Sequence, residues 1–518
     1  MAQRDTTGAA EPGRRAFIGL AVTALAAAAA EADTGQAAAV TDRPRTDGAG
    51  PLDTRVENAR PGNADWRITD PGPADAVEGF ADRAAVLPGE PFGLYVSTTA
   101  PAFTVSAYRM GWYGGDRARL LWRSDRLPGA GQPAPTVDPD TRAVRTDWRR
   151  TTTVDTAGWP EGSYLLRLDA EGGGQRYVPV TVRSRTAAGR TVLVNAVATW
   201  QAYNLWGGHS LYNGPTGGRA TRSLEVTFDR PYAYAHGAGL FLVYEAPLIA
   251  LAERLGLPLA YATGADLARD PGLLEGARCV LSPGHDEYWS VEQRRRVTAA
   301  RDAGTNLAVL GANCCYRRVR YEPSPLGPDR VMVCYKDDYR LDPGFAAGLP
   351  ATTDFRLEPG SDPESSLLGV LYGGYPVDAP FVVTDPGHWV YEGTGVRAGD
   401  GFAHLVGVEY DRVDPAFPTP RPVEVLAHSP VLCAGRPDFA DSAYCTLPGG
   451  AAVFASGTMR WVEALDAQGP GGGGNHGLDA AAGAFTRRVT ENVLLAFATG
   501  PVGTARPAVD NVGSVYRT

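Results

Sequence analysis

The stretch CVLSPGHDEYWS, residues 279–290, joins a short apolar run to a polar link and to the start of a helix. Residues 279–282 have the composition of a strand that is buried on both faces. Ser290 stands three residues before Gln293, which is the spacing of a capping box at a helix N-terminus. A strand that leads directly into a helix is the repeating unit of a parallel sheet, so the stretch predicts an α/β domain.

The pattern continues on both sides of this stretch. Further apolar runs at 191–197, 257–263 and 306–310 predict buried strands, and helices are expected at 244–255, 290–303 and 479–498. In the last helix, Leu494, Leu495 and Phe497 are expected on the apolar side. We therefore predict an α/β domain with a mainly parallel, Rossmann-like sheet at residues 188–505, followed by a tail at 506–518.

The preceding part of the chain has a different pattern. Short β-rich runs at 92–97, 103–108, 163–168 and 177–182 are separated by turn signals, which is typical of a β-sandwich. We predict an immunoglobulin-like sandwich at residues 61–187. Tyr164 lies in one of its late strands, where a structural role is expected.

Composition excludes several classes of protein. The 518 residues are 44% hydrophobic and include 63 glycines and 41 prolines, which argues against both global disorder and an all-helical fold. The net charge of -9 offers no broad cationic surface for nucleic acid. Six cysteines without a CxxC pair are too few for a disulfide scaffold, and the pairing of Cys433 with Cys445 is left open.

The first residues have the features of an export signal. Arg14 and Arg15 precede an apolar run that ends in alanines, which predicts a signal peptide of the twin-arginine type at residues 1–32 and a periplasmic or extracellular protein. An ordinary secretory signal is the alternative. The run is too short to cross a bilayer, so no integral membrane segment is expected. Residues 33–60, rich in Ala, Gly, Pro and Asp, predict a disordered leader.

Polar residues follow three of the predicted strands, and ligands of open parallel sheets bind outside the carboxyl ends of the strands. In an extended link, His285 and Glu287 face the same way while Asp286 turns aside. The pair suits metal binding and proton transfer, or else a structural role at the sheet end and the helix N-terminus. Tyr203 follows the first strand and Asn313 the strand at 306–310, where its amide could orient a carbonyl or an oxyanion.

Several segments carry a family resemblance. The strings TWQAYN (199–204), FDRPY (228–232), GHDEYW (284–289), GAN (311–313) and YRMGWY (108–113) resemble the large (β) subunit of N,N-dimethylformamidase and its relatives. The similarity covers residues 60 to 500. It implies a β-sandwich followed by a domain like the class I glutamine amidotransferases, together with a mononuclear ferric ion bound by two tyrosines and one glutamate.

Carried onto this chain, the resemblance assigns the glutamate ligand to Glu287 and one tyrosine to Tyr203. It places the second tyrosine on Tyr232, with Tyr164, Tyr212 and Tyr234 as weaker options. The catalytic residues that it implies are His285, Asn313 and Lys336, the last of which is the single lysine of the chain.

The function expected from this resemblance is exported, iron-dependent hydrolysis of a C–N bond in a small amide. A hard trivalent cation suits oxygen ligands and would acidify a bound water. A homo-oligomer or a small companion subunit is possible. Three alternatives stay open: a cysteine-dependent hydrolase using Cys314 or Cys315, a binding module with Trp200, Trp206 and Trp289 as stacking platforms, and a zinc site of His285, Glu287 and either His209 or His236.

Overall fold

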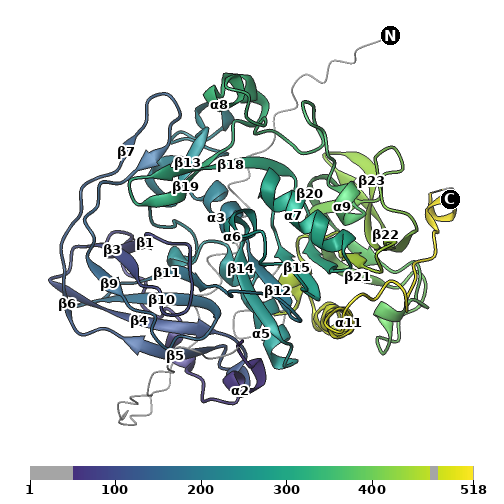
Figure 1. The fold of residues 1–518 in the computed structure, drawn as a ribbon, viewed down its shortest axis with the longest axis horizontal. Helices are drawn as coiled ribbons and strands as arrows, with labels where there is room; N and C mark the ends of the chain where they lie inside the picture. The colour runs from purple at the N-terminus through teal and green to yellow at the C-terminus, as the bar shows by residue number, and fades with distance from the viewer. Residues whose placement is uncertain (1–50, 467–475, 517–518) are drawn as a thin grey trace.

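The computed structural model describes residues 51–466 and 476–516 (Figure 1). The predicted signal peptide, the leader up to residue 50 and the end of the tail at 517–518 lie outside these residues. The protein is mainly β, with several sheets and few helices. The immunoglobulin-like and Rossmann-like fold types stay predictions.

Two sheets form the N-terminal part of the protein, coloured purple to blue in Figure 1. All their pairings are antiparallel except the one between β2 and β11. Val77 and Leu94 of the first sheet share one buried cluster with Val105 and Leu166 of the second, so the sheets pack face to face. The first sheet has the order β1 (Val77–Ala81), β3 (Phe92–Thr98), β9 (Thr152–Val154); the second has the order β2 (Ala85–Val86), β11 (Gln175–Val182), β10 (Gly162–Ala170), β4 (Ala102–Met110), β5 (Ala118–Arg123), with β6 (Leu127–Pro128) paired to β4.

A seven-stranded sheet forms the centre of the molecule. Its first five strands are parallel and its last two are antiparallel. The four predicted strands all fall in the parallel part, within two residues of their expected ends. The order is β14 (Leu259–Thr263), β12 (Thr191–Asn195), β15 (Cys279–Gly284), β17 (Asn306–Gly311), β24 (Ala452–Ala455), β23 (Arg436–Thr446), β22 (Val423–Cys433).

The three predicted helices are present, as α5 (Ala246–Arg254), α7 (Val291–Asp302) and α11 (Ala480–Phe497). The Ser290 side chain caps α7 by accepting from the Gln293 backbone N–H. The Gln293 side chain has no hydrogen-bond partner within the described parts of the chain, so only half of the expected capping box forms. In α11, Leu494 and Phe497 are buried as expected. The expectation for Leu495 is wrong, because this side chain is exposed.

The remaining elements surround the central sheet. A four-stranded sheet has the order β13 (Glu225–Thr227), β19 (Gly327–Val333), β18 (Arg317–Ser324), β16 (Tyr288–Ser290), and the hairpin of β20 (Leu371–Val382) and β21 (Gly401–Arg412) packs on β22. None of the described helices is long and apolar enough to cross a membrane. The short elements are β7 (Thr136–Val137), β8 (Val144–Arg145), α3 (Val197–Tyr203), α4 (Phe241–Tyr244), α6 (Gly264–Arg269), α8 (Pro343–Ala346), α9 (Ser365–Leu368), α10 (Trp461–Ala464) and α12 (Val512–Val515).

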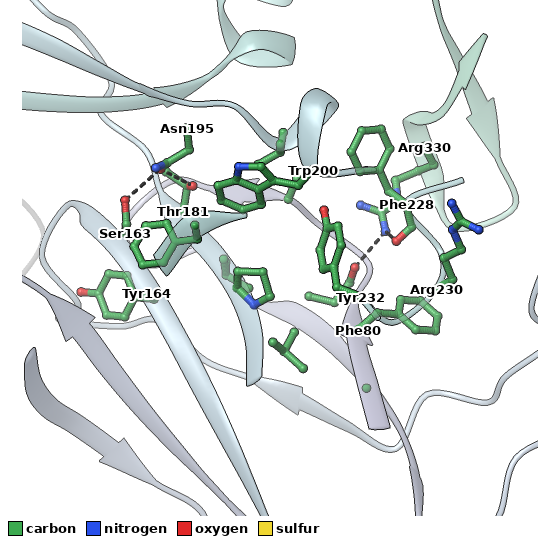
Figure 2. Close-up of a pocket in the computed structure, with 18 residues that line it drawn as sticks. Phe80, Ser163, Tyr164, Thr181, Asn195, Trp200, Phe228, Arg230, Tyr232 and Arg330 are labelled. Atoms are coloured by element: carbon green, nitrogen blue, oxygen red, sulfur yellow. Dashed lines mark hydrogen bonds between the residues drawn. The ribbon is translucent and has the colours of Figure 1, made fainter. Parts of the chain in front are cut away.

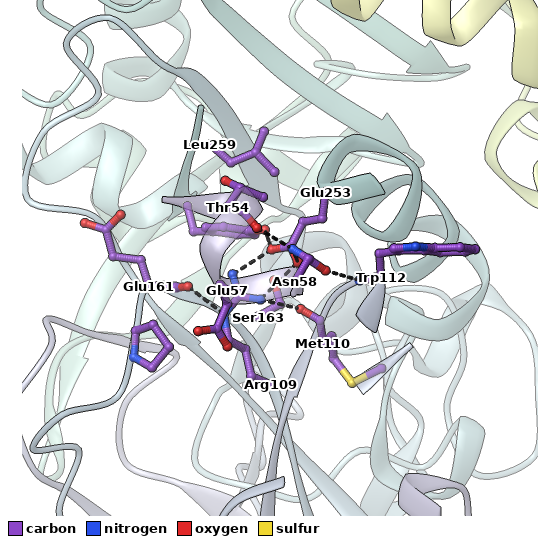
Figure 3. Close-up of polar contacts among 12 residues, drawn as sticks. Thr54, Glu57, Asn58, Arg109, Met110, Trp112, Glu161, Ser163, Glu253 and Leu259 are labelled. Atoms are coloured by element: carbon purple, nitrogen blue, oxygen red, sulfur yellow. Dashed lines mark hydrogen bonds and ion pairs between the residues drawn. The ribbon is translucent and has the colours of Figure 1, made fainter. Parts of the chain in front are cut away.

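The last residues of the predicted leader are folded, which corrects the expectation of disorder through residue 60. They form helix α2 (Thr54–Asn58), capped by the Asp53 side chain. Glu57 on this helix is buried and accepts hydrogen bonds from Arg119 and Tyr113 of the sandwich. Asn58 donates to Glu253 on α5 at 2.8 Å (Figure 3). One side of the helix therefore packs against the sandwich and α5, while Arg55 and Val56 on its other side are exposed.

Candidate functional site

The carboxyl ends of three neighbouring parallel strands bring the predicted site residues together. Strand β12 leads into α3, which ends at Tyr203; β15 leads into His285 and Glu287; β17 leads into Asn313. The strands β15 and β17 approach closely at their ends, where a Cβ on Gly311 would lie 1.8 Å from the Gly284 carbonyl oxygen. Glycine is therefore required there, and the chain turns out of the sheet at this point.

Three oxygen-bearing side chains meet at the centre of this edge. The Tyr203 hydroxyl donates to Glu287 Oε2 at 2.8 Å, and the Tyr212 hydroxyl lies 2.7 Å from both carboxylate oxygens of Glu287. The rings of Tyr203 and Tyr212 stack at a centroid distance of 4.5 Å. All three side chains are buried or half-buried. We call Tyr203, Tyr212 and Glu287 the oxygen cluster.

His285 lies against the oxygen cluster, on the same face of the link as Glu287. Its Nε2 is 3.0 Å from the Tyr203 hydroxyl and 3.4 Å from Glu287 Oε2. Its Nδ1 lies 3.4 Å from the Ala312 carbonyl oxygen, which favours a proton on Nδ1 and directs Nε2 toward the cluster. Asp286 points elsewhere and accepts a hydrogen bond from Ser282, as the alternation of an extended link requires.

Cationic and hydroxyl groups surround the cluster on its other sides. Lys336 Nζ lies 3.4 Å from the ring centroid of Tyr212, in cation–π geometry, and the Tyr288 hydroxyl donates to the Tyr212 hydroxyl at 2.7 Å. Arg317 Nε lies 3.5 Å from Glu287 Oε1. Lys336 is 1% exposed, so its charge is screened very little by solvent.

The Glu287 carboxylate is held in its ionised form by these neighbours. Burial favours the neutral acid, but the hydrogen bond and charge of His285, followed by the charges of Arg317 and Lys336, outweigh burial and hold the pKa of Glu287 well below its usual range. For His285, burial opposes the charged form, and the bond to Glu287 together with the nearby Glu409 carboxylate raises its pKa overall. The contact between the two groups thus favours the charged form of each.

The link itself is fixed by a side chain of α3. Thr199 Oγ1 accepts hydrogen bonds from the backbone N–H groups of Glu287, at 3.0 Å, and Tyr288, at 3.3 Å. On the far side, the Glu287 carbonyl oxygen accepts from the backbone N–H groups of Tyr316 and Arg317. The position of Glu287 is therefore set by backbone bonds to both neighbouring segments.

Tyr232, the sequence-based choice for the second tyrosine, is not placed at the cluster. Its ring packs edge-on against Trp200 and lines a separate cavity between the sandwich and the central sheet (Figure 2). Tyr164 also lies away from the cluster: it stacks on Trp159 in the sandwich and donates to the Pro160 carbonyl oxygen. Among the weaker options it is Tyr212 that contacts Glu287.

Asn313 is held by two acidic residues of β21. Its Nδ2 donates to Glu409 Oε2 at 2.6 Å, and its backbone N–H donates to Asp411 Oδ1 at 2.8 Å. One of the two N–H donors on Nδ2 is therefore engaged by Glu409. Its Oδ1 is buried and has no hydrogen-bond partner among the residues that the structure describes.

The residues of the alternative readings lie in unsuitable environments. Burial raises the pKa of Cys315 to about 12 and that of Cys314 well above the ordinary value, so neither is an activated thiol. Trp200 and Trp289 are buried, which contradicts their use as exposed stacking platforms; Trp206 is half-buried against Trp148.

The zinc alternative has no matching geometry in the described part of the chain. Within residues 51–466 and 476–516, no three His, Cys, Asp or Glu side chains are arranged to hold a metal ion. His209 instead lies 3.2 Å from the Thr221 carbonyl oxygen. The oxygen cluster is not a group of this kind, because two of its three members are tyrosines.

Four residues of the site were not predicted as parts of it: Thr199, Tyr288, Arg317 and Glu409. The first two lie inside strings that carry the family resemblance, and Arg317 follows closely after Asn313. Closeness in sequence to predicted site residues was therefore the only signal that could have identified these three. Glu409 lies on β21, where nothing in the local sequence distinguishes it from a solvated carboxylate.

The geometry of the oxygen cluster fits a small, hard metal ion. Oxygen ligands about 2.0 Å from such an ion in adjacent octahedral positions lie about 2.8 Å apart. The oxygen–oxygen distances of 2.8 Å from Tyr203 to Glu287 and 2.7 Å from Tyr212 to Glu287 match that spacing. Phenolate and carboxylate oxygens are also the donors that a hard cation prefers.

Comparison with known proteins gives one family. Residues 104–476 match the family described as N,N-dimethylformamidase beta subunit-like, C-terminal. No curated protein matches the chain. Among solved structures, a Paenibacillus sp. cycloisomaltooligosaccharide glucanotransferase complexed with cycloisomaltoheptaose aligns at 15% identity with a TM-score of 0.14. That alignment covers 25% of this chain and 18% of the other, so it carries no argument about fold or function.

The family match spans more than half of the chain and includes every member of the oxygen cluster together with His285, Asn313 and Lys336. The chain therefore belongs to the N,N-dimethylformamidase beta subunit-like family.

Proposed function

We propose that the protein is an iron-dependent hydrolase that cleaves the C–N bond of a small amide. Family membership suggests a dimethylformamidase-like amide hydrolase. The observation that carries the proposal is the oxygen cluster, in which two phenols and one buried carboxylate meet at the carboxyl ends of parallel strands. Tyr212 takes the place that the sequence assigned to Tyr232.

Each residue of the cluster has a role in this proposal. Tyr203, Tyr212 and Glu287 would hold a ferric ion, which when bound supplies a Lewis acid for the amide carbonyl and lowers the pKa of a water. Two phenolates and one carboxylate carry three negative charges, which balance a trivalent cation. The charges of Arg317 and Lys336 favour the ionised form of Glu287.

His285 is the group placed to move a proton. Its Nε2 faces the cluster, and its Nδ1 lies against the Ala312 carbonyl oxygen. The contact at Nδ1 therefore fixes the orientation of the ring. In the proposed reaction Nε2 takes a proton from the attacking water and delivers it to the departing amine nitrogen. Glu287, 3.4 Å away, stabilises the imidazolium that forms in between.

The test is elemental analysis and visible spectroscopy of the purified full chain and of two matched tyrosine variants. We expect about one iron per chain and an absorption band from phenolate-to-iron charge transfer. Tyr212→Phe should lose the band and most of the iron, whereas Tyr232→Phe should keep both, because Tyr232 packs against Trp200 in a separate cavity. Circular dichroism establishes that both variants are folded.

Two results would contradict the proposal. One is a folded, iron-free protein that hydrolyses amides at full rate. The other is loss of the band in Tyr232→Phe with retention in Tyr212→Phe, which would show that the cluster is not the metal site.

One hydrogen bond of the sandwich supports an immunoglobulin-like fold. The Tyr164 hydroxyl returns to the backbone four residues upstream, at Pro160, as in the tyrosine corner of immunoglobulin-like sandwiches. We propose that fold for the sandwich, and the class I glutamine amidotransferase-like fold for the α/β part.

Export through the twin-arginine route is tested by fractionating cells that carry Arg14→Lys/Arg15→Lys, in which the protein should stay in the cytoplasm. Sedimentation will show whether the chain self-associates.

A further inference from the structure

The two carboxylate oxygens of Glu287 have different neighbours. Oε2 accepts a hydrogen bond from the Tyr203 hydroxyl at 2.8 Å, and His285 Nε2 lies 3.4 Å from the same oxygen. Oε1 lies 3.5 Å from Nε of Arg317. The Tyr212 hydroxyl stands between the two oxygens, 2.7 Å from each. Oε2 is therefore the oxygen that contacts both phenols, and Oε1 is the one beside Arg317.

Arg317 brings an unused N–H group to Oε1. Its Nε is buried and has no hydrogen-bond partner within the parts of the chain that the structure describes. The separation of 3.5 Å from Oε1 is longer than the ordinary length of about 2.9 Å for such a bond. A buried donor without an acceptor is unfavourable and uncommon in folded proteins. A small movement of the Glu287 carboxylate toward Nε would supply the missing acceptor.

Other contacts hold Arg317 beside Glu287. Its backbone N–H donates to the Glu287 carbonyl oxygen at 2.8 Å, where β18 begins next to β16. Its Nη1 donates to Oδ1 of Asp354, which is itself buried. The guanidinium carbon lies 4.6 Å from the ring centroid of Tyr316, in cation–π geometry. The side chain is thus fixed from three directions, as a group that orients a metal ligand must be.

Loss of the phenol protons would change the hydrogen bonding at Oε1. A hydroxyl group has one proton, so Tyr212 can donate fully to only one oxygen, and Tyr203 already donates to Oε2. When both phenols become phenolates, Oε1 has no donor left in the oxygen cluster. It can then turn to the ion as a second ligand atom from the same carboxylate, or accept from Arg317 Nε. The unused N–H of Arg317 favours the second arrangement.

We propose that Arg317 is a positioning residue whose Nε–H holds Oε1 of Glu287, so that the carboxylate binds iron through Oε2 alone. The inference rests on the proposed function, and it names the residue that fixes how Glu287 takes part in it. A carboxylate that uses one oxygen leaves a further position on the ion open to water or to the amide, which a catalytic site requires. A carboxylate that used both oxygens would close that position.

Three variants at residue 317 separate the N–H group from the positive charge. Glutamine carries its NH2 group at the place of the arginine Nε, so Arg317→Gln keeps the donor and loses the charge. Arg317→Lys keeps the charge but has a methylene group there, and Arg317→Met has neither. The control is Arg320→Gln, the same change on the same strand, where the arginine contacts Asp342 and Glu322.

The measurement is the binding of azide to the iron-loaded full chain, followed through the phenolate-to-iron absorption band. Azide is a small anion that occupies open positions on ferric iron, so its dissociation constant reports whether Oε1 has taken one. We expect Arg317→Lys to bind azide more weakly than the unaltered protein, and Arg317→Met more weakly than Arg317→Gln. Each difference should be at least about tenfold, which corresponds to one hydrogen bond to a charged group. Both comparisons are made at equal charge.

The outcomes separate the inference from the proposed function. Equal azide binding within both pairs, in proteins that hold iron and show the band, overturns the inference while the proposed function stands. Azide binding by Arg317→Gln that is as weak as that of Arg317→Met assigns the effect to charge and overturns the role of Nε. A tenfold loss in Arg320→Gln as well would show a general effect of β18 and would also overturn it.

Iron-free, folded protein that hydrolyses amides overturns the proposed function and the inference with it. Circular dichroism establishes that each variant is folded. If Arg317→Lys does not fold, the comparison of Arg317→Gln with Arg317→Met decides the question by itself. An electron paramagnetic resonance spectrum of the ferric ion that changes in Arg317→Lys and Arg317→Met, but not in Arg317→Gln or Arg320→Gln, supports the inference independently of azide.

Discussion

Replacing Glu253 by glutamine should remove several kcal/mol of stability. Glu253 and Arg109 form a fully buried pair, with contacts of 2.6 and 3.0 Å, and both side chains are 0% exposed (Figure 3). Glu253 also accepts from Tyr261 at 2.5 Å and from Asn58 at 2.8 Å. Four donors thus converge on one carboxylate. Glu253→Gln would direct two further N–H donors toward them and would remove the carboxylate that Arg109 contacts directly.

The magnitude follows from the burial. Breaking a buried ion pair by removing one partner costs about 3–5 kcal/mol, because the remaining charge stays desolvated. The matched control is Glu171→Gln, which removes the carboxylate of the exposed pair between Arg126 and Glu171, 64% and 52% exposed. Exposed pairs contribute about 0–1 kcal/mol, so this variant should unfold as the unaltered protein does.

Urea unfolding, followed by both tryptophan fluorescence and far-ultraviolet circular dichroism, measures the difference. Two probes are needed because a chain with two packed parts need not unfold in one step. A loss below about 1 kcal/mol in Glu253→Gln, with the same slope of free energy against urea, would refute the reasoning, because it would mean that the buried charge is solvated in the variant. The double variant Arg109→Met/Glu253→Met, which removes both charges, should recover part of the loss.

Two further predictions concern the site. Cys314→Ala/Cys315→Ala should keep kcat within about twofold once loaded with iron, because both thiols are buried with raised pKa values; a loss of more than a hundredfold in the folded variant would favour a cysteine mechanism. The pH dependence of stability in metal-free protein should reflect the Glu287 and His285 pair. The lowered pKa of Glu287 contributes stability that is present above pH 4.5, its unfolded value, and is lost as pH falls; the raised pKa of His285 contributes stability that is present below pH 6.5 and is lost as pH rises. Glu287→Gln should therefore be most destabilising between these values, and equal urea midpoints for variant and parent across pH 4–8 would contradict the coupling.

The sequence predicted the central strands and part of the site for one physical reason. Buried parallel strands are continuous apolar runs, and the residues that follow them meet at one edge of the sheet. This reasoning placed Tyr203, His285 and Glu287 together, and the structure brings them within hydrogen-bonding distance. The alternation of an extended link also separated Asp286 from its two neighbours.

Tyr212 could not be chosen from the sequence, because no periodic pattern fixes the path of its loop. That path depends on Arg230, which is fully buried and donates to the carbonyl oxygens of Asn204, Trp206 and His209. An arginine that organises a loop from a distance in sequence leaves no local signal. Tyr232 ends one of the strings that carry the family resemblance, and the sequence-based assignment therefore favoured it, although in the structure its ring packs against Trp200 and not against Glu287.

The prediction of disorder through residue 60 was wrong for a related reason. Residues 53–58 are polar enough to resemble the disordered stretch before them, and a short helix has little stability of its own. What holds α2 is tertiary: Glu57 is buried against Arg119 and Tyr113, and Asn58 reaches Glu253. Buried ion pairs between segments far apart in the chain cannot be inferred from the composition of either segment.

The hydrogen bonds of the oxygen cluster explain how such a group of donors can be built into the interior before any ion binds. Both phenols donate to Glu287, so the buried carboxylate has its acceptors satisfied, and Tyr288 in turn donates to Tyr212. Lys336 and Arg317 offset the negative charge of Glu287. A metal ion that displaced the two phenol protons would replace hydrogen bonds by metal–oxygen bonds at nearly the same oxygen–oxygen spacing, so the ligands would need little rearrangement. Folding would thus organise the three proposed ligands before the ion binds, which would favour tight binding.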